Sequence, residues 1–164
     1  MTAKKKEEYR VLKALRYGIL LILFIYIGFL FASRGDSNTP FQTVEKAVVK
    51  AADDKEMTKG QVRDLKRLYG LNEKDYEAVS FYYTQATMGV NELLLIRIAD
   101  GQDTAVIEAA IKTRKETQLD NFEGYGAEQV KLLHNSVMKT RGNYVLFVVS
   151  PKAEKVEKAF VKSL

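Results

Sequence analysis

An uncharged apolar run at residues 17–32 constrains this chain more than any other feature of its sequence. Eleven of its sixteen residues are Ile, Leu or Phe, which favours insertion into hydrocarbon by roughly 3 to 7 kcal/mol. As a helix the run would extend about 24 Å, and the flanking Arg16 and Arg34 could reach the headgroups with their long stems. The sequence therefore predicts a transmembrane anchor at 17–33, built mainly from Tyr17, Ile19, Leu20, Leu21, Ile22, Leu23, Phe24, Ile25, Tyr26, Ile27, Phe29, Leu30 and Phe31.

A removable signal peptide is the main alternative for this run. Cleavage after Ala32 would place Leu30 three residues before the cut, and cleavage after Ser33 would place Phe31 there, and both side chains are too bulky. The chain has no cysteine, so lipoprotein processing is excluded. A buried helix of a soluble domain is disfavoured because the run is apolar on every face. We therefore expect an anchor that is not cleaved.

Charge on either side of the run predicts the orientation. The basic tail at 1–16 precedes it, so the positive-inside rule predicts a single-pass cell-membrane protein with a cytoplasmic N-terminus. A polar linker at 34–39 then leads to an extracytoplasmic domain at 40–164. The chain has 26 basic and 21 acidic residues, but the two kinds are equal in number over 36–164. A neutral domain argues against nucleic acid as a partner, whereas the tail is expected to lie against anionic lipid.

Hydrophobic periodicity divides the domain into helices and strands. It predicts helices at 40–54, 59–69, 103–122, 127–138 and 151–164, and strands at 76–85, 90–99 and 143–150. The last two strands are apolar on both faces, so helices or a partner should cover both faces. The predicted order is ααββααβα. We expect an α+β domain with a short, mostly antiparallel sheet of about three strands packed with helices.

Several segments together resemble one known family. GVNELLLIR at 89–97 is followed by an acidic turn, by RKETQ at 114–118, by a Tyr between glycines ahead of AEQV at 127–130, and by GNYVLFVVS at 142–150. This series is similar to domain-of-unknown-function family 4358, and the resemblance covers about residues 40–162. It implies a small extracytoplasmic envelope protein of Gram-positive, largely clostridial bacteria, with an N-terminal anchor or lipobox. It implies no established activity and supplies no catalytic residues.

The chain offers few residues for catalysis or metal binding. It has one His and no Cys, whereas a nucleophilic triad needs a base beside its nucleophile and a zinc site needs three or four ligands. His134 lies at the edge of a helical stripe and is expected to pack or to face solvent. DGQD at 100–103 lacks the alternating acids of a calcium loop, so we expect a turn and a helix cap there. We therefore expect no cofactor and no enzymatic activity.

Glu92 has the most informative position among the acidic residues. It opens an apolar strand on the parity of Leu94 and Ile96, so its carboxylate would face the core and need a partner. Arg114 or Arg141 could supply that partner in a structural ion pair. Glu92 and Arg114 are also candidates for contact with a ligand. A glycosidase would need a second carboxylate about 5 to 10 Å away, and the sequence offers no obvious one.

Tyr125, between Gly124 and Gly126, is the other candidate for a partner contact, although its ring could instead fold back onto the core. The aromatic run at 81–83 favours cross-strand packing over a stacking platform for sugars or peptides. We expect a non-catalytic, membrane-anchored interaction module that binds another envelope component, either a protein or a wall polymer. The alternative is a small-ligand-binding or sensing domain in which Glu92 lines a pocket.

Overall fold

The structure, a computed structural model, describes residues 13, 15–27, 35–99 and 101–164. The chain divides into two compact units, residues 1–35 and residues 36–164. In the first unit, residues 15–27 are helical.

The helix at 15–27 does not provide the expected anchor. Among the described residues, no helix combines the length and the apolar character needed to cross a membrane. This finding overturns the transmembrane helix expected at 17–33 and, with it, the single-pass localisation. Residues 28–33 of the expected anchor, and 1–12 and 14 of the expected tail, lie outside the described residues.

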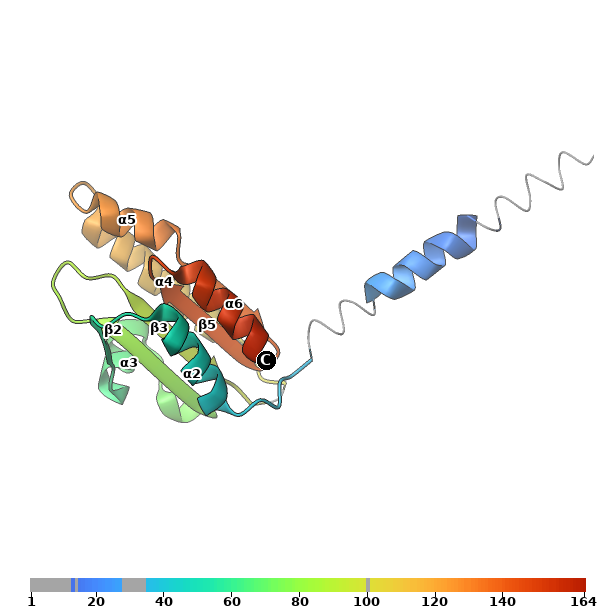
Figure 1. Ribbon diagram of the computed structural model, residues 1–164, viewed down its shortest axis with the longest axis horizontal. Coiled ribbons are helices and arrows are strands. Elements are labelled where there is room, and N and C mark those ends of the chain that lie inside the picture. The colour runs from blue at the N-terminus through green and yellow to red at the C-terminus, as the bar shows by residue number, and fades with distance from the viewer. Residues whose placement is uncertain (1–12, 14, 28–34, 100) are drawn as a thin grey trace, which may run out of the picture. The chain divides into compact units, whose positions relative to one another are not determined.

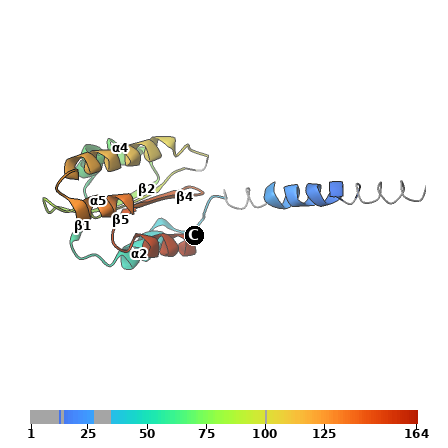
Figure 2. The same cartoon turned by 90° about the horizontal axis from the view of Figure 1, so that it is seen from above.

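The second unit is an α+β domain in which helices cover both faces of one sheet (Figures 1 and 2). Its elements, in chain order, are α2 (Phe41–Ala52), β1 (Met57–Lys59), α3 (Val62–Tyr69), the 3-10 turn η1 (Glu73–Asp75), β2 (Ala78–Thr84), β3 (Glu92–Arg97), α4 (Ala105–Phe122), α5 (Ala127–His134), β4 (Val137–Arg141), β5 (Tyr144–Val149) and α6 (Ala153–Ser163).

The five strands form one antiparallel sheet in the order β1-β2-β3-β5-β4. The expectation of about three strands is therefore wrong in number, and the expected element order is wrong as well. The α+β class is correct. The two strands that sequence reasoning missed, β1 and β4, are the two edges of the sheet, while β3 and β5 lie at its centre. In this centre Leu94 stands opposite Phe81 on one side and Phe147 on the other.

The helix expected at 127–138 is wrong in its last turn. α5 ends at His134, and Val137–Arg141 instead forms β4, which pairs with β5 along its whole length. Gly142 and Asn143 make the two-residue turn of this hairpin, with Gly142 at φ +54°. Such tight hairpin turns need a positive φ, which glycine adopts at little cost.

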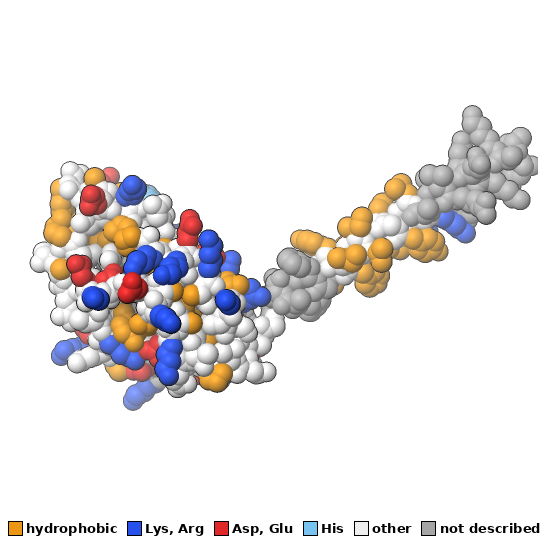
Figure 3. All heavy atoms as spheres, viewed as in Figure 1, with side chains coloured by type: hydrophobic (Ala, Val, Ile, Leu, Met, Phe, Trp, Pro, Cys, Tyr) orange, Lys and Arg blue, Asp and Glu red, His pale blue; other side chains and the backbone are white. Residues whose placement is uncertain are grey.

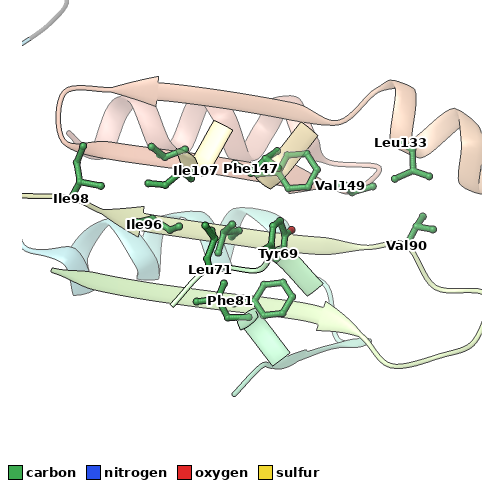
Figure 4. Packing of buried hydrophobic residues seen from close by; sticks show 14 of the residues in the cluster. Tyr69, Leu71, Phe81, Val90, Ile96, Ile98, Ile107, Leu133, Phe147 and Val149 are labelled. Atoms are coloured by element: carbon green, nitrogen blue, oxygen red, sulfur yellow. The ribbon is translucent and has the colours of Figure 1, made fainter. Parts of the chain in front are cut away.

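Two hydrophobic cores lie on opposite faces of the sheet. α2 and α6 pack on one face, against Leu93, Leu95, Tyr144, Leu146 and Val148. α3, α4 and α5 pack on the other, against Phe81, Leu94, Ile96, Val145, Phe147 and Val149 (Figure 4). The Tyr69 ring lies edge-on to Phe81 and Phe147 in this second core, with ring centroids 5.5 and 6.5 Å apart. Both faces of β3 and β5 are thus covered by helices, which explains why these strands are apolar on both sides.

The segment that enters the domain is fastened beside its last helix. The Tyr144 hydroxyl donates to the Thr39 carbonyl at 2.7 Å, and the Ser37 amide donates to the Asn143 side chain at 3.0 Å. The hydroxyls of Ser37 and Thr39 each donate to the carbonyl of Leu164 at 3.4 Å. Residues 37 and 164 therefore lie next to each other.

Candidate functional site

Glu92 lies at the first position of β3, and the strand period decides where its side chain points. Residues of like parity on a strand share one face, and Leu94 and Ile96 belong to the core beneath α3, α4 and α5. The Glu92 side chain is 1% exposed. The sequence thus places a carboxylate inside an apolar layer, where a charged group is costly unless it is paired.

Arg114, on the middle of α4, supplies the partner. Its Nη2 and Nε donate to the same carboxylate oxygen of Glu92, Oε2, at 3.1 and 3.3 Å. The guanidinium side chain is 13% exposed, so it bridges between the core and the surface. The second oxygen, Oε1, is buried and has no hydrogen-bond partner among the described residues. Arg141, the other partner considered, stands opposite Tyr144 on β4 and so belongs to the opposite face of the sheet.

Tyr69, the last residue of α3, lies beside this pair. Burial raises the pKa of Glu92, and although Arg114 and then Tyr69 act in the opposite direction, the pKa stays above its usual value. Burial, followed by the nearby Glu92 charge, holds the pKa of the Tyr69 hydroxyl well above its usual range. The Tyr69 hydroxyl and Glu92 Oε1 are both buried, and neither has a hydrogen-bond partner among the described residues. The three groups form a buried polar cluster that is incompletely hydrogen-bonded.

The Glu92 carboxylate is closed off from solvent, although Arg114 reaches it. Four surface hollows of the domain have volumes between about 280 and 810 Å³, and neither Glu92 nor Tyr69 lines any of these four. A carboxylate that acts on a substrate or recognises a ligand must touch it. In this conformation the geometry of Glu92 is therefore that of a core ion pair.

Tyr125 lies apart from the buried cluster, on the loop between α4 and α5. Its ring centroid is 5.8 Å from that of Phe122, yet the residue remains 68% exposed. Gly126 is buried against Phe122, and a Cβ there would lie 2.7 Å from the Phe122 ring, so the close turn requires glycine. In the described part of the chain, Tyr125 makes no hydrogen bond or ion pair with Glu92 or Arg114. The structure thus brings Glu92 and Arg114 together and leaves Tyr125 on the surface.

The surroundings of Tyr125 are acidic. Asp120, Glu123 and Glu128 are all exposed, and no basic residue occurs between Asp120 and Val130. The β2–β3 loop lies at the same end of the domain as the α4–α5 loop (Figure 1), and its Met88 is 47% exposed. The Met88 carbonyl accepts a hydrogen bond from Gln129 of α5 at 3.2 Å, which ties the β2–β3 loop to α5.

A second polar cluster, around Glu45 of α2, was missed by sequence reasoning. Its Oε1 accepts hydrogen bonds from the Ser80 hydroxyl at 2.6 Å, from the Tyr82 hydroxyl at 3.0 Å and from Lys59 Nζ at 3.0 Å. Burial acts to raise the pKa of Glu45, but these three donors outweigh it and lower the pKa below its usual value. The sequence did contain a signal for this cluster. Ser80 and Tyr82 occupy alternate positions of β2, which indicates a more polar face of the sheet on which an acidic residue of a helix could pack.

A comparison with known protein families shows to which family the chain belongs. The family described as a domain of unknown function, DUF4358, matches residues 50–150, which is more than half of the chain. The chain therefore belongs to the DUF4358 family, as the sequence motifs indicated. No curated protein and no solved structure matches it.

Proposed function

We propose that this DUF4358 domain is a non-catalytic interaction module, and that a protein partner contacts the surface formed by Tyr125, Met88 and the acidic residues around them. This surface is called the Tyr125 surface below. The observation that carries the proposal is the exposure of Tyr125. Among the described residues of 36–164, it is the one Phe or Tyr that is exposed, whereas the others are buried or half-buried.

The energetic argument rests on the area of the ring. A tyrosine buries about 200 Å² in a complete interface, so covering the exposed 68% of Tyr125 would remove roughly 140 Å² from water. At about 25 cal/mol per Å² of apolar surface, that sets an upper bound of about 3 kcal/mol before the costs of association are subtracted. Tyrosine also loses little side-chain entropy on binding, because it has two rotatable side-chain bonds, and it is enriched among the residues that dominate interfaces.

The charge of the Tyr125 surface sets the character of the partner. Three exposed acids lie within five residues of Tyr125 in the sequence, and no basic residue offsets them between Asp120 and Val130. A basic partner surface with an apolar recess for the ring would be complementary in both charge and shape. Recognition of a small ligand by Glu92 is less well supported, because the carboxylate is sealed in the core and bound by Arg114.

Site-specific photo-crosslinking of the full chain in cells tests this function. A benzoylphenylalanine residue at position 125 should yield a discrete protein adduct, and the same residue at Val106 should not. Val106 is a matched control because it is 66% exposed and lies at the far end of α4. A Glu123→Lys/Glu128→Lys background should abolish the adduct at 125. Identical adducts at both positions, or none at 125, would overturn the proposal.

A further inference from the structure

The edge strand β4 presents a backbone that no neighbouring strand covers. It is last in the strand order and pairs with β5 on one side only. Among the described residues, no backbone hydrogen bond joins Val137–Arg141 to a segment other than β5. The other edge, β1, has three residues against the five of β4, and its Lys59 is engaged by Glu45. β4 is therefore the longer template for an added strand.

Two surface hollows flank this edge, one on each face of the sheet. The hollow on the α4 side has a volume of about 410 Å³, with Ile111 and Phe147 among its lining residues and Met138, Lys112 and Lys115 around them. Met138 is 45% exposed, so this hollow is apolar at its base and open to solvent.

The hollow on the α6 side has a volume of about 810 Å³ and a more polar lining, which includes Val137, Lys155 and Lys158. Met138 and Thr140 face α4, because Thr140 bonds to Glu108 of that helix, whereas Lys139 faces α6 and pairs with Glu157 at 3.3 Å. β4 lines these hollows with its first two residues, Val137 on the α6 side and Met138 on the α4 side. Alternate side chains of an added strand would therefore enter the two hollows where the strand passes this end of β4.

The charge around the edge indicates what kind of strand would fit. The two hollows and β4 together carry seven basic side chains against three acidic ones. Basic side chains also gather on the face of the domain that carries α2 and α6 (Figure 3). Pairing of two copies through β4 is disfavoured, because an antiparallel pair centred on Lys139 would set that lysine against its own copy.

We infer that β4 is a docking edge for an extended, acidic segment of a partner protein, which adds to the sheet as a sixth strand. Apolar residues of the segment enter the hollow between α4 and Met138. Acidic residues on its other face meet Lys139, Arg141, Lys155 and Lys158. Backbone hydrogen bonds to β4 supply affinity and the two hollows supply selectivity. This surface has the opposite charge to the Tyr125 surface and does not depend on it.

Fluorescence anisotropy with the full chain and labelled seven-residue peptides tests the inference. The probe is an alternating peptide, EVEVEVE, which offers valines to one face and glutamates to the other. Its counterparts are KVKVKVK and an EVEVEVE peptide that is N-methylated at alternate residues, so that it keeps its charge but cannot complete a strand ladder. We expect saturable binding of EVEVEVE, at least tenfold weaker binding of the methylated form, and no binding of KVKVKVK.

Two matched double variants distinguish binding at the β4 edge from a general effect of surface charge. Lys155→Gln/Lys158→Gln removes two exposed lysines that the glutamates of the peptide would meet, and should weaken EVEVEVE binding about fivefold. Lys131→Gln/Lys162→Gln removes the same charge from exposed positions outside both hollows and should leave binding unchanged. Tyr125→Ser should also leave it unchanged, so this test and the crosslinking test can fail separately.

Three results would overturn the inference. The first is no saturable binding of EVEVEVE, and the second is equal binding of the methylated peptide, which would reduce the effect to charge alone. The third is concentration-dependent self-association of the chain that EVEVEVE displaces, because the edge would then belong to a second copy. The peptide comparison uses the unaltered chain, so it stays informative even if the Lys155→Gln/Lys158→Gln variant folds poorly.

Discussion

Replacing Arg114 with methionine should destabilise the domain by about 3 kcal/mol at pH 7.5. Methionine keeps an apolar stem of similar length but removes both donors to Glu92 Oε2. Removing one member of a buried ion pair costs roughly 3 to 5 kcal/mol, because the other charge is left buried without compensation. We expect the low end of that range, since Arg114 already reaches solvent and Glu92 can protonate instead of staying charged.

The pH dependence of this cost follows from the pKa of Glu92, which is already raised in the folded protein. When the pKa of a carboxyl group is higher in the folded protein than in the unfolded chain, the group stabilises the fold at low pH. That contribution is fully present below the unfolded-state pKa and is lost as pH rises through the folded-state pKa. Arg114 counteracts the rise, so Arg114→Met should raise the pKa of Glu92 further. The variant should therefore lose stability more steeply than wild type as pH rises, and the difference should become small below about pH 4.

Urea unfolding at pH 4, 6 and 7.5 measures these free energies. Glu92→Gln removes the buried charge and should cost no more than about 1 kcal/mol, because Arg114 can turn toward water. The double variant Glu92→Gln/Arg114→Met should recover about 2 kcal/mol of the loss seen in Arg114→Met. A loss for Arg114→Met that is below about 1 kcal/mol, or that is the same at pH 4 and pH 7.5, would refute this account of the pair.

Three further substitutions test other parts of the fold. Glu45→Gln should cost about 1 kcal/mol at pH 7 and less at pH 3, because the lowered pKa of Glu45 contributes stability that is lost as pH falls through its folded value; equal losses in urea at both pH values would contradict this. Gly70→Ala should cost about 1 to 2 kcal/mol by thermal unfolding, because Gly70 ends α3 at φ +70°, and a neutral effect would count against strain there. Leu94→Ala should cost about 3 kcal/mol by urea unfolding, since the side chain is fully buried between two strands, and a loss under 1 kcal/mol would mean that the core relaxes.

The strands at the centre of the sheet were predictable because they carry a strong pattern. β3 and β5 are apolar on both faces, which indicates cover on both sides, and helices provide it. β1 has three residues, which is too few to show a period. The first two residues of β4 were assigned to a helix because Val137 continues the spacing of Val130 and Leu133. The alternating residues of β4 and the Gly142–Asn143 turn are a hairpin signal that outweighs this spacing.

The face of the strand on which Glu92 lies was likewise predictable from the sequence, but the residue that pairs with Glu92 was not. The period of a strand fixes which face a residue occupies, so a core-facing carboxylate could be expected from the sequence. Arg114 and Arg141 both have the reach for an ion pair. The choice depends on which face each one occupies, and Arg141 stands opposite Tyr144 on the face away from Glu92. The Glu45 cluster was hidden for a similar reason, since Ser80 and Tyr82 lie 35 and 37 residues away along the chain.

The hydrogen bonds from Ser37 and Thr39 to Leu164 nearly close the domain into a ring. Because the two ends of this ring already touch, a short loop could join residue 164 to residue 37 without disturbing α2 or α6. The chain could then be opened at Gln85–Thr87, between β2 and β3, giving a circular permutant with every strand neighbour of the original sheet.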